Sequence, residues 1–402
     1  MSSIKPRRRA AAVWLLVLSL LASCAGGDDS SPSSSPGSQA TTTTVSSTVS
    51  TSPTTSTTAA GSTTSTTSPG ETTTTTPPLD DVTFESLNGI DTISDFSGFI
   101  DSGLGRWHES VDGLEEIELT STIDGAQQPA LWLPPSGEGT KPLIVILHSW
   151  SSGYQQHAGI PYALWAQENG WAMIAPQFRG INDSPDALGS DLAVQDVADA
   201  IEYATAQEGV RTDKVFAVGY SGGGMMSLLV AGRHPDKVSA VAAWGPPYDL
   251  IEFYLQSIQT GLGYVGDIEA GCGGDPTEEE EARAECVHRS PMAHLDGARE
   301  SGVPVLIGHG INDSLLSPAQ SGWAFNHLAN SSDQFSETQL EELAQGDVPD
   351  VAEPLEGESF FGDGDPDPVL VRHSGPVVVV FFEAGHEMVY EASVRWFASD
   401  PG

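Results

Sequence analysis

Short runs of apolar residues recur along the chain from about residue 116 to residue 382, and several of them are apolar at nearly every position. Such runs are typical of strands that are buried on both faces. Segments with helical spacing of apolar residues alternate with them. We therefore predict an α/β fold with a doubly wound, mostly parallel sheet covered by helices on both sides. The expected strands are 116–122, 130–133, 143–147, 171–175, 214–218, 240–244, 303–307 and 377–382. The expected helices are 162–169, 193–206, 223–232, 319–328 and 387–397.

The N-terminal residues 1–23 have the pattern of an export signal. A basic start is followed by a short apolar run, shorter than the roughly 20 residues that span a bilayer, and by small residues before Cys24. The pattern resembles a bacterial lipobox, which predicts lipidation of Cys24 and a protein that is exported and anchored to the cell membrane. An ordinary cleaved signal with an incidental Cys is the alternative.

Residues 24–79 consist almost entirely of Thr, Ser, Pro, Gly and Ala. Such a composition cannot bury enough apolar surface to offset the entropy of ordering, so a disordered tether is expected. The α/β domain is expected to occupy residues 80–402, outside the membrane.

The sequence is strongly acidic, with 55 Asp and Glu against 16 Lys and Arg and a formal net charge of −39. A chain with so few cations cannot neutralise a run of phosphates, which excludes a nucleic-acid binder. The same charge disfavours adsorption to an anionic membrane surface, so the lipid anchor is the only membrane contact expected. The 3 Cys are too few for a disulfide scaffold or a zinc cluster. No cofactor or metal is expected.

A Gly-x-Ser-x-Gly sequence centred on Ser221 lies between an expected strand and an expected helix. This is the context of a nucleophile elbow, a sharp and strained turn that exposes the serine hydroxyl. The glycines are needed because such a turn leaves no room for flanking side chains. A glycine-rich turn around a buried serine is the alternative.

A serine nucleophile needs a base and a carboxylate that orients the base, and in this type of fold the acid precedes the histidine along the chain. Asp313 and His386 each follow an expected strand, and His386 is expected to begin a helix. We therefore predict Ser221, Asp313 and His386 as the catalytic residues. Asp249 is the rival acid, and His309 is expected to structure its loop.

Two backbone N–H groups are needed to form an oxyanion hole. One is expected from Gly222, directly after the nucleophile. The other is expected from Trp150, in the loop after the strand 143–147, although an ordinary strand-end loop is the alternative.

The chain resembles the α/β-hydrolase superfamily and, within it, the prolyl-oligopeptidase-like catalytic domains. The resemblance spans about residues 115–400 and rests on the elbow and on the segments 178–180, 189–196, 231–235, 308–313 and 384–386. It implies a serine hydrolase that carries Ser221, Asp313 and His386. The chain departs from the family pattern at 148–150, where His-Ser-Trp replaces the usual His-Gly-Gly. The β-propeller common in the peptidases has no room between the tether and the first strand.

The same resemblance implies a cap over the site at about 248–300, and it sets apart an acidic insertion at about 331–375. Four consecutive Glu at 278–281 are expected to form a solvated helix face. Residues 363–367 resemble a calcium loop, but Pro368 stands where the loop glycine belongs, so a solvated loop is expected.

Cys272 and Cys286 are the two Cys that remain once Cys24 is committed to lipid. Oxidising compartments let such pairs persist, and closing a loop of this size contributes roughly 3 kcal/mol in the chain-entropy model. We predict a disulfide between them, with two free thiols as the alternative.

The leading functional hypothesis is the hydrolysis of a small ester, or less readily an amide, through an acyl-enzyme. A peptidase acting on short peptides is the second, in which the four-Glu run would help recognise an α-amino group. A non-catalytic binding module on a hydrolase fold is the third. The aromatic candidates for lining the substrate cleft are Trp150, Tyr220, Trp244 and Tyr248, although packing in the core is an equal alternative for Trp244.

Overall fold

The computed structural model describes residues 82–350, 361 and 365–401. The chain separates into two units, Met1–Thr73 and Thr74–Gly402, and the described residues belong to the second. The predicted signal peptide, the lipidation site Cys24 and the whole tether, residues 24–79, lie outside the described residues. So do parts of the acidic insertion and of the calcium-like segment.

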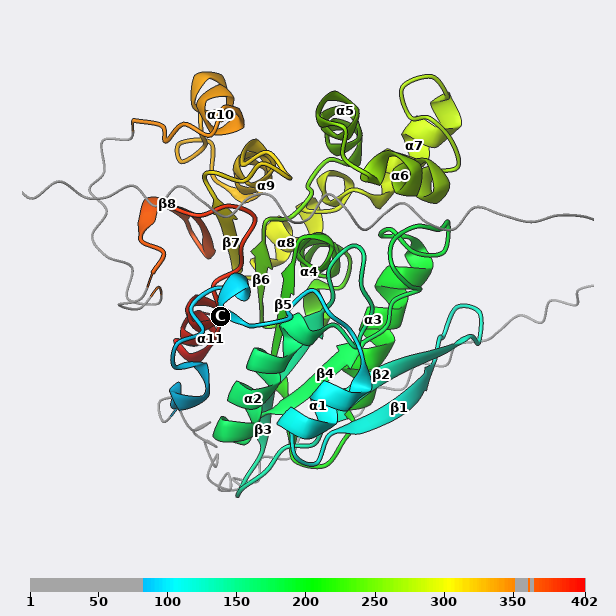
Figure 1. Ribbon diagram of the computed structural model, residues 1–402, viewed down its shortest axis with the longest axis vertical. Coiled ribbons are helices and arrows are strands. Elements are labelled where there is room, and N and C mark those ends of the chain that lie inside the picture. Colours follow the sequence, from blue (N-terminus) through cyan, green and yellow to red (C-terminus); the bar gives the residue numbers. More distant parts are fainter. Residues whose placement is uncertain (1–81, 351–360, 362–364, 402) are drawn as a thin grey trace, which may run out of the picture. The chain divides into compact units, whose positions relative to one another are not determined.

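A mostly parallel sheet forms the centre of the described domain (Figure 1). Its nine strands, counted over the described residues, have the order β1-β2-β4-β3-β5-β6-β7-β9-β8. The strands from β4 to β9 in this order pair in parallel, whereas β1, β2 and β8 pair antiparallel. The strands are β1 (Glu115–Thr120), β2 (Gln127–Leu133), β3 (Lys141–Leu147), β4 (Ala172–Pro176), β5 (Val210–Tyr220), β6 (Ala240–Trp244), β7 (Val305–Gly310), β8 (Pro368–Ser374) and β9 (Val377–Phe382).

Helices cover both faces of this sheet. They are α1 (Leu104–Ser110), α2 (Ile160–Asn169), α3 (Asp191–Thr205), α4 (Gly222–Arg233), α5 (Leu250–Thr260), α6 (Tyr264–Cys272), α7 (Glu280–Arg289), α8 (Asp296–Ser301), α9 (Ala319–Leu328), α10 (Glu337–Ala344) and α11 (Tyr390–Ala398). Short 3₁₀ helices lie at η1 (Glu85–Leu87), η2 (Ile93–Asp95), η3 (His157–Gly159), η4 (Pro235–Lys237) and η5 (Pro291–Ala293). Within the part of the chain that the structure describes, no helix has the length and apolar character needed to cross a bilayer.

Alternate residues of the central strands enter two separate hydrophobic clusters. In β3, Leu143 and Val145 belong to the cluster that contains residues of α3, α4 and α9, whereas Ile144 and Ile146 belong to the cluster with residues of α1, α2 and α11. Side chains alternate across a strand, so a strand that is apolar at every position must be covered on both faces. The predicted doubly wound sheet is therefore confirmed.

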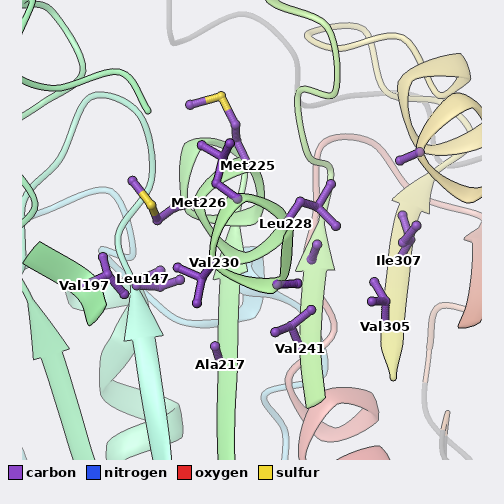
Figure 2. Close-up of a cluster of buried hydrophobic side chains, with 14 of the residues drawn as sticks. Leu147, Val197, Ala217, Met225, Met226, Leu228, Val230, Val241, Val305 and Ile307 are labelled. Atoms are coloured by element: carbon purple, nitrogen blue, oxygen red, sulfur yellow. The ribbon is translucent and has the colours of Figure 1, made fainter. Parts of the chain in front are cut away.

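Helix α4 lies against the sheet beside β3, β5 and β6 (Figure 2). Its side chains in this cluster include Met225, Met226, Leu228 and Val230, and those of the strands include Ala217, Val241, Val305 and Ile307. Burial of a large aliphatic side chain stabilises a fold by about 1.5–3 kcal/mol. This packing fixes the N-terminus of α4, which directly follows Ser221.

The last expected helix begins later than its sequence pattern indicated, at Tyr390. The residues before it are bound instead to the N-terminal part of the domain. The backbone N–H of Ser94 donates to the Glu387 carboxylate at 3.1 Å, and that of Ile93 donates to the Met388 carbonyl at 3.0 Å. The expectation that His386 begins a helix is therefore wrong, because these long-range hydrogen bonds hold its neighbours in a loop.

The acidic insertion contains two elements that the apolar pattern did not reveal, α10 and β8. Strand β8 pairs antiparallel with β9 at the edge of the sheet. Its sequence mixes apolar residues with Arg372 and His373, and most of its residues are partly exposed. A half-buried edge strand of this kind lacks the continuous apolar run by which the central strands were recognised.

The helices α5, α6, α7 and α8 lie between β6 and β7 in the chain, and α5, α6 and α7 stand at one end of the sheet (Figure 1). Cys272 at the end of α6 forms a disulfide with Cys286 in α7, as predicted. Glu278, Glu279, Glu280 and Glu281 are exposed where α7 begins, in agreement with the expected solvated surface.

Candidate active site

Ser221 occupies the turn between β5 and α4, with φ 57° and ψ −119°. A positive φ is strained for a residue with a side chain and persists only where the surroundings enforce it. The backbone N–H of Ser221 donates to the Trp244 carbonyl at 2.7 Å. A Cβ atom at Gly219 would lie 2.1 Å from the Gly223 carbonyl oxygen, so the turn requires glycine there. The result is a partly exposed serine at the carboxyl end of a central strand.

Asp313 is buried in the loop after β7 and accepts four hydrogen bonds. Its Oδ2 accepts from His386 Nδ1 at 2.5 Å and from His309 Nε2 at 3.0 Å. Its Oδ1 accepts from the backbone N–H groups of Leu315 at 2.8 Å and Leu316 at 3.0 Å. Burial by itself raises the pKa of Asp313, but the charges and hydrogen bonds of the two histidines hold it well below its usual range. The group is therefore a carboxylate, and His386 Nδ1 must carry the proton of their shared bond.

The His386 imidazole lies against the residues that flank the elbow. Its ring centroid is 4.7 Å from that of Tyr220, whose hydroxyl donates to the His386 carbonyl at 2.8 Å. A Cβ atom at Gly245 would lie 3.1 Å from His386 Cε1. Tyr220 precedes Ser221, and Gly245 follows Trp244, the hydrogen-bond partner of the serine backbone. The imidazole is therefore placed beside the serine.

The second ring nitrogen of His386, Nε2, is buried and has no hydrogen-bond partner among the described residues. Its Nδ1 is held by a carboxylate, so Nε2 is the nitrogen left to accept a proton. In structures without substrate, the bond from the serine hydroxyl to the base is often long and tightens only when substrate binds. This arrangement is the one that a general base requires.

The rival acid Asp249 does not reach the histidine. It is the N-cap of α5, and its Oδ1 accepts from the backbone N–H groups of Ile251 at 2.8 Å and Glu252 at 3.3 Å. Its place in the structure is explained by helix capping.

The loop after β3 brings the Trp150 backbone close to the elbow. The preceding amide, Ser149 N–H, is already donated to Gln156 Oε1 at 2.9 Å. A Cβ atom at Gly222 would lie 2.8 Å from Trp150 N, so the two backbones are in close contact. Among the hydrogen bonds of the described residues, neither Trp150 N nor Gly222 N donates one. Two unpaired donors therefore lie close together beside Ser221, as the two N–H groups of an oxyanion hole would have to.

The aromatic candidates for the substrate cleft have different places. Trp244 is fully buried, and its indole N–H donates to Ser393 Oγ at 2.8 Å, so it belongs to the core. Trp150 is also buried, at 2% exposure. Tyr220 packs on His386. Only Tyr248 of the four lines an open cleft of about 560 Å³ that is described in the structure, together with Asp249, Glu252, Trp323, Asn326 and His327.

A family model described as the prolyl oligopeptidase family matches residues 165–342. The matched region includes Ser221 and Asp313 and ends before His386. The sheet order, the elbow after a central strand and this match agree. The chain has the α/β-hydrolase fold.

Several proteins are similar to this α/β-hydrolase domain over part of their length. Feruloyl esterase B of Thermothelomyces thermophilus is 27% identical over 125 residues, which are 29% of this chain and 43% of that protein. Dipeptidyl aminopeptidase BIII of Pseudoxanthomonas mexicana is 25% identical over 222 residues, 51% of this chain and 31% of that protein. The chain thus spans less than half of the length of the relatives it matches.

Among solved structures, an esterase of Pyrococcus furiosus has a TM-score of 0.44 at 13% identity, covering 71% of this chain and 87% of that chain. The acylaminoacyl peptidase of Pyrococcus horikoshii has a TM-score of 0.43 at 21% identity, covering 56% of this chain and 36% of that chain.

Three contacts of this α/β-hydrolase site were not predicted from the sequence: Tyr220 to the His386 carbonyl, His309 to Asp313, and Gln156 to the Ser149 amide. His309 was expected only to structure its loop. In the structure it is fully buried, and its other nitrogen, Nδ1, bonds Ser321 Oγ of α9 at 2.7 Å. Its position four residues before Asp313, at the end of a buried strand, is the sequence feature from which this contact could have been predicted.

Proposed function

We propose that this chain is a serine hydrolase that cleaves a carboxylic ester, or less readily an amide, through an acyl-enzyme. Ser221 attacks the carbonyl carbon of the substrate while His386 Nε2 takes its proton. Asp313 holds the imidazole in the required tautomer and stabilises the imidazolium that forms. The N–H groups of Gly222 and Trp150 bind the developing oxyanion.

Collapse of the tetrahedral intermediate breaks the bond to the leaving group, which receives the proton from His386. Water then attacks the acyl-enzyme with His386 again as the base, and the acid product and free Ser221 are released. No metal enters these steps.

The observation that carries the proposal is the 2.5 Å bond from His386 Nδ1 to the buried Asp313, with Nε2 unpaired beside the strained elbow. Removal of a triad nucleophile typically lowers the rate about 10⁶-fold. The Ser221→Ala variant should therefore lose both turnover and labelling by a fluorophosphonate. Labelling that persists on another serine of this variant would contradict the assignment.

An ester substrate is supported by the names of several relatives, which are feruloyl or acetylxylan esterases. A comparison of acyl p-nitrophenyl esters with aminoacyl p-nitroanilides tests it, and we expect the esters to be hydrolysed faster. A higher kcat/KM for the anilides would favour the peptidase instead.

The peptidase is supported by a different observation, the two carboxylates in the open cleft. Burial and the nearby Asp249 raise the pKa of Glu252, as expected for acids that share a cleft. Such a site would hold a cationic α-amino group. If it does, Glu252→Gln should raise KM for substrates with a free amino end and leave that for N-acetylated substrates unchanged. The binding-module alternative predicts no turnover of either class.

We also propose that the protein is exported and anchored to the cell membrane through Cys24, with the hydrolase domain on the outer side. The lipobox-like sequence supports this. The Cys24→Ala variant should leave the membrane fraction and lack the mass of the lipid. A variant that stays in the membrane with unchanged mass would contradict the anchor.

A further inference from the structure

We propose that Asp267, on the helix α6, is a positioning residue for the oxyanion hole, because it holds the Trp150 side chain and through it the Trp150 backbone N–H. The inference rests on the proposed function and adds a second role for the segment α5–α6. In this proposal, the segment fixes the position of one oxyanion donor, the Trp150 backbone N–H.

The Trp150 indole is enclosed by residues of α5 and α6. Its Nε1–H donates to Asp267 Oδ2 at 3.0 Å. Its ring meets the rings of Phe253 in α5 and Tyr264 in α6 edge-on, with centroids 5.6 Å and 5.5 Å away. Each such aromatic contact contributes about 0.5–1.5 kcal/mol beyond area burial. The orientation of the indole is therefore set by α5 and α6.

The Trp150 backbone is held at its carbonyl. Asn182 is fully buried and donates from Nδ2 to the Trp150 carbonyl at 3.3 Å, while its Oδ1 accepts from the Leu188 backbone N–H at 3.0 Å. Helix α6 packs on this same loop, since a Cβ atom at Gly271 would lie 2.3 Å from Leu188 Cδ2. The ring of Trp150 is thus held by α6, and its carbonyl is held by the loop that contains Asn182 and Leu188.

With its ring and carbonyl fixed, Trp150 has its backbone N–H left as a free donor, and the nitrogen lies close to Gly222. A loop amide has no helix or strand ladder to hold it, so its direction depends on these contacts. The usual glycine in the family pattern has no side chain that residues of α5 and α6 could bind. Trp at this position has an indole side chain that other residues can hold, and Asp267 accepts the hydrogen bond from its N–H.

Asp267 lies in the first turn of α6 and is partly buried. Burial raises the pKa of Asp267, and the hydrogen bond from Trp150 lowers it. Tyr264 lies in the same turn, and burial and the carboxylates of Asp267 and Asp313 raise its pKa.

An oxyanion donor acts mainly in the transition state, so its displacement should lower kcat with little change in KM. A misplacement on the order of 1 Å can lower a rate about 10²-fold. We expect Asp267→Ala to lower kcat by about 10-fold to 100-fold on an ester that the wild type turns over. Asp267→Asn keeps a carbonyl acceptor for the indole and should retain most of the activity.

The decisive experiment is a double-mutant cycle with Trp150→Phe, which keeps an aromatic ring and removes the indole N–H. If Asp267 acts through that N–H, the double variant should be no slower than the worse single variant. The inhibition constant of a trifluoromethyl ketone, whose hydrate carries an oxyanion, should rise in parallel with the loss of kcat.

Glu269→Ala is the matched control. Glu269 lies on the same helix and accepts from the Tyr254 hydroxyl of α5 at 2.7 Å, and among the hydrogen bonds of the described residues it has none to Trp150. This variant should lower the melting temperature as Asp267→Ala does and leave kcat unchanged. An equal loss of kcat in Glu269→Ala, or multiplicative losses in the cycle, would overturn the positioning role.

The outcome also separates this inference from the proposed function. A wild type with Ser221-dependent turnover and an unaffected Asp267→Ala variant would overturn the inference alone. A wild type without Ser221-dependent turnover would overturn both.

Discussion

The two sides of the candidate active site are held in place by different physical means. On the nucleophile side, Ser221 and the unpaired N–H of Gly222 are fixed by backbone geometry and by the absence of side chains at Gly219 and Gly222. On the acid–base side, Asp313 and His386 are fixed by hydrogen bonds between ionisable side chains. The first side depends on shape and the second on charge.

This difference determines how each side responds to substitution. A side held by steric fit fails when a single atom is added, whereas a side held by charge fails when a proton or a charge is moved at constant volume. Substitutions that change only one of these properties can therefore separate the two sides.

The largest effect should come from a change of charge at constant size on the acid–base side. Asp313→Asn would lower activity on the order of 10⁴-fold, because the amide favours the wrong imidazole tautomer. The matched control is Asp249→Asn, which keeps a side chain suited to the N-cap of α5 and should remain active. Steady-state kinetics on the same ester decide between them, and an inactive Asp249→Asn with an active Asp313→Asn would reverse the assignment.

A change of shape without charge should break the nucleophile side. The added Cβ atom in Gly222→Ala would lie 2.8 Å from both Trp150 N and Trp150 Cα, so one donor must move. We expect a loss of about 10²-fold to 10³-fold in kcat, the range for one oxyanion donor. Gly105→Ala, where the structure leaves open space around the new atom, is the control. Unchanged kcat in Gly222→Ala would mean that steric fit does not fix this side.

A smaller effect concerns stability and comes from one titrating group on the nucleophile side. His148, in the loop after β3, is buried and stacks on Phe178 at 3.7 Å between ring centroids. Burial lowers the pKa of His148 to about 4. The folded-state pKa lies below the unfolded value, so this stability is complete above about pH 6.5 and is lost as the pH falls toward 4.

Between pH 7.5 and pH 5 the loss should be about 2 kcal/mol of unfolding free energy. His148→Phe keeps a ring for stacking and removes the titration, so its unfolding free energy should fall less over this interval. Urea unfolding of both proteins at the two pH values measures the difference. Equal pH dependence in the two proteins would assign the acid sensitivity to other groups.

Much of this site was predictable because its main residues follow local chain patterns. Each predicted residue stands directly after a buried strand, and such strands are recognisable from continuous apolar runs. Asp313 and His386 are hydrogen-bonded, and the His386 ring lies against Tyr220, which directly precedes Ser221. The two amides at Gly222 and Trp150 follow from the same reasoning.

What could not be predicted depends on side chains that meet across long separations in the chain. The hydrogen bond from Tyr220 to the His386 carbonyl spans 166 residues. The bond from Ser94 to Glu387 spans 293 residues, and it accounts for the wrong start of the last helix. Trp244 offers the same lesson, because its buried ring meets Ser393 and Phe382, which lie more than 130 residues later in the chain.

The pairing of the N-terminal part of the domain with the loop after β9 has a consequence for dividing the chain. Besides the bond from Ser94 to Glu387, a backbone bridge joins Thr92 to Val389, and Tyr390 N–H donates to the Asp91 carbonyl at 3.1 Å. A fragment cut at the first strand would keep the whole sheet and all three candidate catalytic residues. It would nevertheless lose the hydrogen bonds that hold the loop after His386. We therefore expect the minimal active unit to be longer than the sheet and to begin before residue 91.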